Sequence, residues 1–131
     1  MKRISNWLFS FSSGWVALAA LLGFLLFTAL VLPGQAQQAE AYSEDAGSPD
    51  SSFFYTAGQL YSFAERYGPQ GRESYIRARW TFDVAWPLVY TLFLTTSISW
   101  LLKKSEHQDR WAGRLNLLPL FAMGLDFLEN T

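Results

Sequence analysis

The 131-residue sequence contains no cysteine and a single histidine, His107. Without cysteine the chain can form no disulfide, no thiolate metal site, no haem attachment motif and no thiol nucleophile. One histidine also argues against a metal site built from imidazole ligands, so we expect neither a metal nor a cofactor. The sequence has no glycine-rich phosphate loop, no HExxH or GxSxG motif and no basic nucleic-acid-binding patch, so we expect no nucleic-acid partner.

Charged residues are also scarce, at 16% of the chain against about 25% in an average soluble domain. No charged side chain occurs between Ile4 and Ala39, and residues 15–32 within this stretch are almost entirely apolar. At about 1.5 Å per residue, residues 15–32 form roughly 27 Å of helix, close to the thickness of the hydrocarbon core of a bilayer. They therefore predict a first membrane span.

A cleaved secretory signal is the alternative interpretation of this first segment. Lys2 and Arg3 give it a basic start, and residues 34–36 form a small-x-small sequence of the kind found at cleavage sites. Its apolar core is, however, longer than the roughly 7–15 residues of a signal sequence. A second apolar stretch of similar strength also follows, which favours a membrane span.

Two further apolar stretches extend this pattern. Residues 84–102 carry no charge and have a tryptophan near each end, where aromatic side chains meet the membrane interfaces, so we expect a second span. Residues 115–131 are apolar but contain Asn116, Pro119 and Asp126. At about 1.5 Å per residue they offer roughly 25 Å, which is marginal for a crossing. Either this third helix stops at the outer interface or the natural chain continues.

Basic residues flank the start of the first predicted span and the end of the second. Two of them precede the first span, and others follow the second in the loop at residues 103–114. The positive-inside rule therefore predicts that the N-terminus and this loop are cytoplasmic and that residues 33–81 are external. Residues 33–51 are polar and acidic, so we expect an extended or mobile outer linker there.

The remainder of the external segment has a helical pattern. Apolar and aromatic residues recur at spacings of three and four over residues 52–67, which predicts an amphipathic helix. Gly68 and Pro69 then end it. A second helix is expected over residues 72–83, continuous with the second span. We interpret the pair as an interfacial hairpin, with a partner-binding or ligand-binding surface as the alternative.

Charged side chains gather at the outer ends of the predicted second and third spans, and they form our candidate polar cluster: Arg77, Arg79, Asp83, Asp126 and Glu129. Arg79 and Asp83 are four residues apart and can pair on one helix face. Charges at such depth are costly unless they are paired or hydrated. We expect Asp126 or Glu129 to pair with one of the arginines, the alternative being general acid/base chemistry by the carboxylates. We assign no catalytic residue.

A set of distinctive positions runs through the C-terminal half of the chain. They are Tyr67-Gly68, Gly71-Arg72, Tyr75, Arg79, Asp83, Pro87-Leu88, Tyr90, Leu118-Pro119 and the D-F-L-E-N sequence at Asp126–Asn130. Together they resemble a pattern in small uncharacterised bacterial membrane proteins of about four helices. The resemblance implies that the D-F-L-E-N sequence lies within a third helix and that a fourth helix is to be expected. It implies no activity.

The sequence therefore predicts an all-α, single-domain (residues 1–131) polytopic membrane protein of two to three transmembrane helices in a bacterial inner membrane. One function that fits is a non-catalytic accessory or structural subunit of a larger membrane assembly, whose partners are the lipid bilayer and other membrane protein subunits. A second is a lipid-processing enzyme that uses outer-leaflet carboxylates in a polar pocket. A third is a lipid-binding or small-molecule-binding module, with a cavity lined by tyrosine and tryptophan and without converging carboxylates.

Overall fold

The computed structural model describes residues 2–43, 54–105 and 112–129 and is helical over almost all of them, which confirms the predicted all-α class. The elements in chain order are α1 (Lys2–Phe11), α2 (Gly14–Leu30), α3 (Leu32–Ser43), α4 (Ala57–Lys104), the 3₁₀ helix η3 (Ala112–Leu117) and α5 (Leu118–Glu129). Helix α4 contacts every other element.

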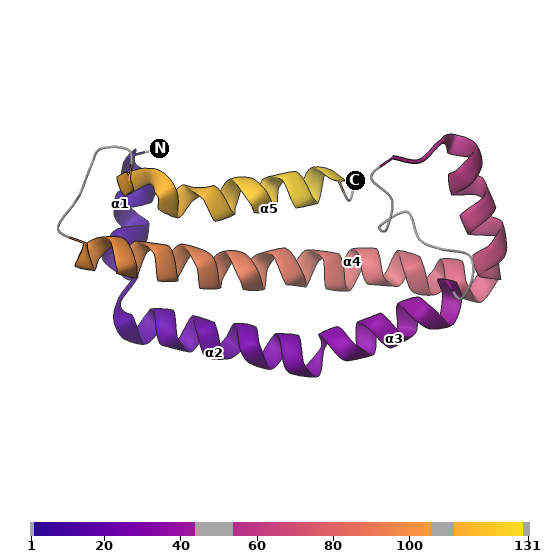
Figure 1. Ribbon diagram of the computed structural model, residues 1–131, viewed down its shortest axis with the longest axis horizontal. Coiled ribbons are helices and arrows are strands. Elements are labelled where there is room, and N and C mark those ends of the chain that lie inside the picture. The colour runs from indigo at the N-terminus through magenta and orange to yellow at the C-terminus, as the bar shows by residue number, and fades with distance from the viewer. Residues whose placement is uncertain (1, 44–53, 106–111, 130–131) are drawn as a thin grey trace.

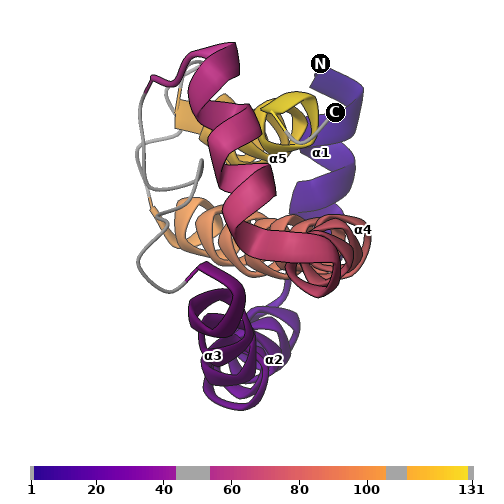
Figure 2. The ribbon, with the colours of Figure 1, turned by 90° about the vertical axis from the view of Figure 1, so that its right-hand side faces the viewer.

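The long helices form an open row with α4 in the middle. Helices α2 and α3 run along one side of α4, and α5 runs along the other side in the direction opposite to α4 (Figure 1). The end-on view in Figure 2 places α2 and α3 across α4 from α5. Since α2 and α5 each pack on α4 alone over most of their length, the described helices enclose no central core.

Two helical stretches are long and apolar enough to cross a membrane: Gly14–Ser43, which comprises α2 and α3, and Ala57–Lys104. In the most apolar 18 residues of each stretch, only 6% of the residues of the first and 28% of the residues of the second are buried. The core helix of a soluble protein would be mostly buried. The third predicted span is different, because α5 has 12 residues and is therefore only about 18 Å long.

Helix α3 corrects the prediction of an extended linker at residues 33–51. The segment Leu32–Ser43 is helical and packs against α4. Its proline, Pro33, lies in the first turn, where a missing backbone N–H costs nothing, and alanine and glutamine are good helix formers. The polar composition of this segment therefore indicated exposure rather than disorder. Residues 44–51 lie outside the described residues.

Helix α4 is divided at Gly68, as the sequence predicted. Gly68 has φ 63° and ψ −178°, a conformation that is essentially restricted to glycine. The part before it starts at Ala57 rather than at residue 52, because Thr56 caps it: the Thr56 hydroxyl accepts from the Gln59 N–H at 3.3 Å. We call Ala57–Tyr67 the arm; it lies crosswise to the rest of α4 (Figure 1). The continuous helix predicted for residues 72–102 is confirmed and begins earlier, at Pro69.

Helix α1 was not predicted. It crosses the end of the row at which α4 ends (Figure 1) and is amphipathic, because Ser5 and Leu8 are buried while Ile4, Trp7 and Phe11 are exposed. The rings of Trp7 and Phe11 stack at 5.8 Å between centroids. The sequence pattern is dominated by the apolar stretch that follows, so the separate helical periodicity of Lys2–Phe11 did not stand out.

Candidate functional site

Arg79 and Asp83 form the predicted ion pair on one face of α4. The Arg79 Nη1 atom lies 3.0 Å from Asp83 Oδ2, and the two side chains are 25% and 23% exposed. The Arg79 Nε and Nη2 groups also donate to the Tyr75 hydroxyl, at 3.1 and 2.6 Å. One side of the guanidinium is thus held by Tyr75 and another by Asp83, which fixes its orientation along the helix.

Three tyrosines pack beside this pair, and we call them the tyrosine cluster. Tyr42 of α3 lies 5.2 Å from Tyr67 and 6.3 Å from Tyr75 between ring centroids, and Tyr67 lies 6.0 Å from Tyr75. A cavity of about 240 Å³ between α3 and α4 is lined by the ion pair and by two of these tyrosines, Tyr42 and Tyr75. Among the described residues that line it, Asp83 supplies the only carboxylate.

Replacing Gly71 with alanine is expected to lower the free energy of unfolding by about 1–3 kcal/mol, the usual cost of overpacking. A Cβ atom at Gly71 would lie 2.9 Å from the Cβ of Tyr42 and 3.0 Å from that of Tyr67, so α3 would have to move away from α4. Gly124→Ala is the matched control, because no atom lies within 4 Å of the added Cβ, and alanine is favoured in a helix by up to about 1 kcal/mol. Equal denaturation curves for the two variants would contradict the close approach.

The other predicted site residues lie elsewhere. Arg77 Nη2 is 3.9 Å from Glu73 Oε1, and both side chains are about three-quarters exposed. Asp126 accepts a hydrogen bond from the Tyr90 hydroxyl of α4, and Glu129 is exposed at the end of α5. The sequence predicted that Asp126 or Glu129 pairs with one of the arginines, and for Asp126 this is wrong within the described residues. Its partner is a tyrosine two turns further along α4 than Asp83, or about 10 Å.

A row of hydroxyl groups on α4 faces η3 and α5. The Thr91 hydroxyl donates to the carbonyl of Pro119 at 3.3 Å, and the Ser99 hydroxyl accepts from Asn116 Nδ2 at 3.1 Å. Between them, Thr95 is buried and its hydroxyl has no hydrogen-bond partner among the described residues. Together with Tyr90, these residues form what we call the hydroxyl seam. It joins α4 to α5 through polar contacts, as is common between membrane helices.

Asn116 extends this seam to α1, and no pattern in the sequence predicted its contacts. Its side chain is fully buried. Its Oδ1 accepts from the Ser5 hydroxyl at 2.9 Å, and its Nδ2 also donates to the Ser5 carbonyl at 3.2 Å. Nearby, Lys103 Nζ donates to the carbonyl of Ser12 at 2.7 Å. These contacts fix α1 across the end of the row.

The carboxylates of the candidate polar cluster lie apart and do not surround one cavity. Asp83 pairs with Arg79, Asp126 with Tyr90, and Glu129 lies at the end of α5. Within the described residues, no group of three or more His, Cys, Asp or Glu side chains could hold a metal ion. The arrangement is suited to holding helices together, and its described side chains offer no paired acid and base at one cavity. Comparisons with protein-family models, with curated proteins and with solved structures gave no match.

Proposed function

We propose that this chain is a non-catalytic integral membrane protein that serves as an accessory or structural subunit of a larger membrane assembly. In this proposal it lies in a bacterial inner membrane with its N-terminus and residues 103–114 in the cytoplasm. The proposal is supported by the depth at which polar groups occur along the helices and by the surfaces that the open row leaves uncovered.

The charged groups at the two ends of the uncharged part of α4, residues 84–102, are separated by a distance suited to a bilayer. About 20 residues separate the Arg79–Asp83 pair from Lys103, so the helix between them is roughly 30 Å long. Helix α1 lies crosswise near the Lys103 end of this stretch, whereas the arm lies at the opposite end of α4, beyond the ion pair (Figure 1). The exposed apolar side of α1 is the feature expected of a helix lying in a membrane interface.

The uncovered helix faces of the open row are the main support for the role of a subunit. Within α2 only Ala17 is buried, and within α5 only Pro119 is buried. On the uncovered face of α5, Leu118, Phe121 and Leu125 are between 56% and 67% exposed. Their spacing of three and then four residues is the one at which helices pack side by side. This face is therefore our proposed contact with a helix of another subunit.

Site-specific photocrosslinking in native membranes tests this contact. A benzophenone amino acid at Phe121 or Leu125 is expected to give one discrete adduct of larger mass, containing the same second protein in both cases. The matched control is Leu22 of α2, which is exposed to a similar degree at 52% and should give lipid adducts only. Lipid adducts alone at all three positions would contradict the proposal. An adduct of exactly twice the chain mass would replace it with self-assembly.

The alternative of a lipid-processing enzyme receives no support from the geometry. Its outer-leaflet carboxylates would have to meet at one cavity, whereas Asp83 pairs with Arg79 and Asp126 binds Tyr90, which lies about two helical turns further along α4.

A further inference from the structure

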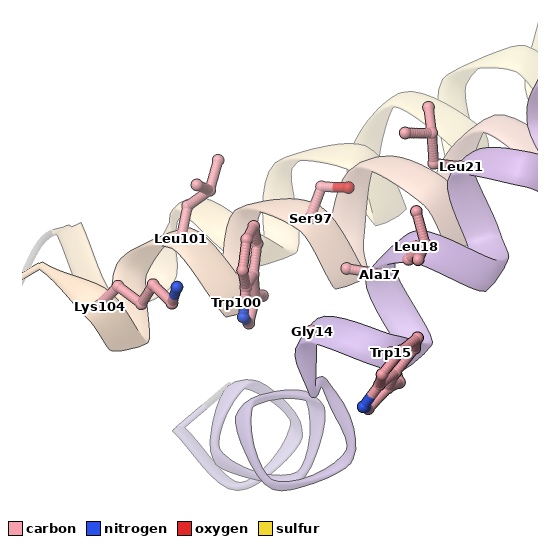
Figure 3. A pocket seen from close by; sticks show the side chains of 9 residues that line it. All are labelled: Gly14, Trp15, Ala17, Leu18, Leu21, Ser97, Trp100, Leu101 and Lys104. Carbon is pink, nitrogen blue, oxygen red and sulfur yellow. The ribbon is translucent and has the colours of Figure 1, made fainter.

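A groove with a volume of about 650 Å³ lies between the first turns of α2 and the last turns of α4 (Figure 3). Its apolar wall includes Ala17, Leu18 and Leu21 of α2 and Leu101 of α4. Trp15 and Trp100 flank Gly14 at one end of it. Gly14 permits this shape, since a Cβ atom there would lie only 3.1 Å from the indole nitrogen of Trp100.

The charge that lines this groove is positive. Lys104 lines the groove, and its ammonium nitrogen lies 4.7 Å from the centroid of the Trp100 ring. No carboxylate occurs among the described residues that line it. The combination is a hydrocarbon wall with a cation and two indole N–H groups at its rim. Such a groove is complementary to a molecule with an apolar chain and an anionic head.

We propose that this groove binds one anionic phospholipid of the cytoplasmic leaflet, with an acyl chain along the leucine wall and the phosphate beside Lys104. The inference rests on the proposed membrane location, which puts Lys104 at the level of the cytoplasmic headgroups. The length of the groove favours a lipid over a partner helix. It spans residues 14–21 of α2 and 97–104 of α4, or about 10 Å of each, which is too short to seat a transmembrane helix along its length.

Native mass spectrometry of the full chain in detergent tests this site, with dioleoyl phosphatidylglycerol and dioleoyl phosphatidylcholine as probes. The unsubstituted chain is expected to retain one phosphatidylglycerol with at least tenfold preference over phosphatidylcholine. Lys104→Gln should reduce the preference to less than twofold. Arg3→Gln is the matched control, because it removes the same charge from an exposed residue of α1 and should leave the preference unchanged.

A second variant tests the apolar wall. Ser97 lines the groove and lies on the side of α4 that faces Leu18 in Figure 3. Ser97→Phe should fill this space and reduce retention of both lipids at least fivefold while the helical circular dichroism signal is unchanged. A preference that survives Lys104→Gln, or one that Arg3→Gln removes equally, would overturn the lipid site. Release of the chain from membranes by carbonate would instead overturn the proposed membrane location.

Discussion

Replacing Tyr90 with phenylalanine is expected to lower the free energy of unfolding by about 1.5–3 kcal/mol, the range for a hydrogen bond to a charged group. The substitution removes the hydroxyl that donates to Asp126 and leaves the ring in place. The carboxylate of Asp126 then loses its hydrogen-bond donor between two apolar helices, where an unpaired carboxylate is costly. Tyr61→Phe on the exposed side of the arm is the control, with an expected change within about 0.5 kcal/mol.

A double-mutant cycle separates this contact from general damage to the fold. Asp126→Leu alone leaves the Tyr90 hydroxyl without its acceptor, whereas the double substitution leaves no stranded polar group. Unfolding in mixed micelles should therefore show the double variant to be less destabilised than the sum of the two single variants by at least about 1 kcal/mol. Strict additivity would mean that the two side chains do not meet.

Asn116→Leu is expected to have the largest effect on stability. The substitution removes all three side-chain hydrogen bonds of a fully buried residue, two to Ser5 and one to Ser99. At about 0.6–1.7 kcal/mol for each hydrogen bond between membrane helices, the expected loss is about 2–5 kcal/mol in total. Asn6→Leu on the exposed side of α1 serves as the control, with a change expected within about 0.5 kcal/mol.

Hydrogen exchange gives this prediction a local signature. Because Asn116 fixes α1 to η3 and α4, amide exchange in Lys2–Phe11 should accelerate at least tenfold in Asn116→Leu. Exchange in α3, which lies at the opposite end of the row (Figure 1), should be unchanged. Equal acceleration in both helices would show that the substitution destabilises the whole chain and that α1 has no specific attachment through Asn116.

The features predicted correctly are those that depend on neighbouring residues. The break at Gly68 followed from a glycine next to a proline, and the Arg79–Asp83 pair followed from a spacing of four. The two long apolar helices followed from runs without charge. Composition was a poorer guide at residues 33–43, because polar residues with good helix propensity form a helix once a neighbour such as α4 is available for packing.

The contacts that were missed depend on how distant elements align. Tyr90 and Asp126 are 36 residues apart, and Ser5 and Asn116 are 111 residues apart. A single sequence gives the face on which each residue lies but not the register of α5 along α4. The polar positions on both helices were therefore visible, while the choice between arginine and tyrosine as the partner of Asp126 required the packed structure.

Labelling of single cysteines in intact cells tests the proposed membrane location and orientation of the chain. Since the chain has no cysteine of its own, a residue introduced at exposed Gln37 on α3 or at exposed Ser105 after α4 is the only thiol in the protein. In the proposed orientation, an impermeant maleimide labels Gln37→Cys in intact cells and labels Ser105→Cys only after the membrane is permeabilised. Labelling of both positions in intact cells, of neither, or of Ser105→Cys alone would contradict it.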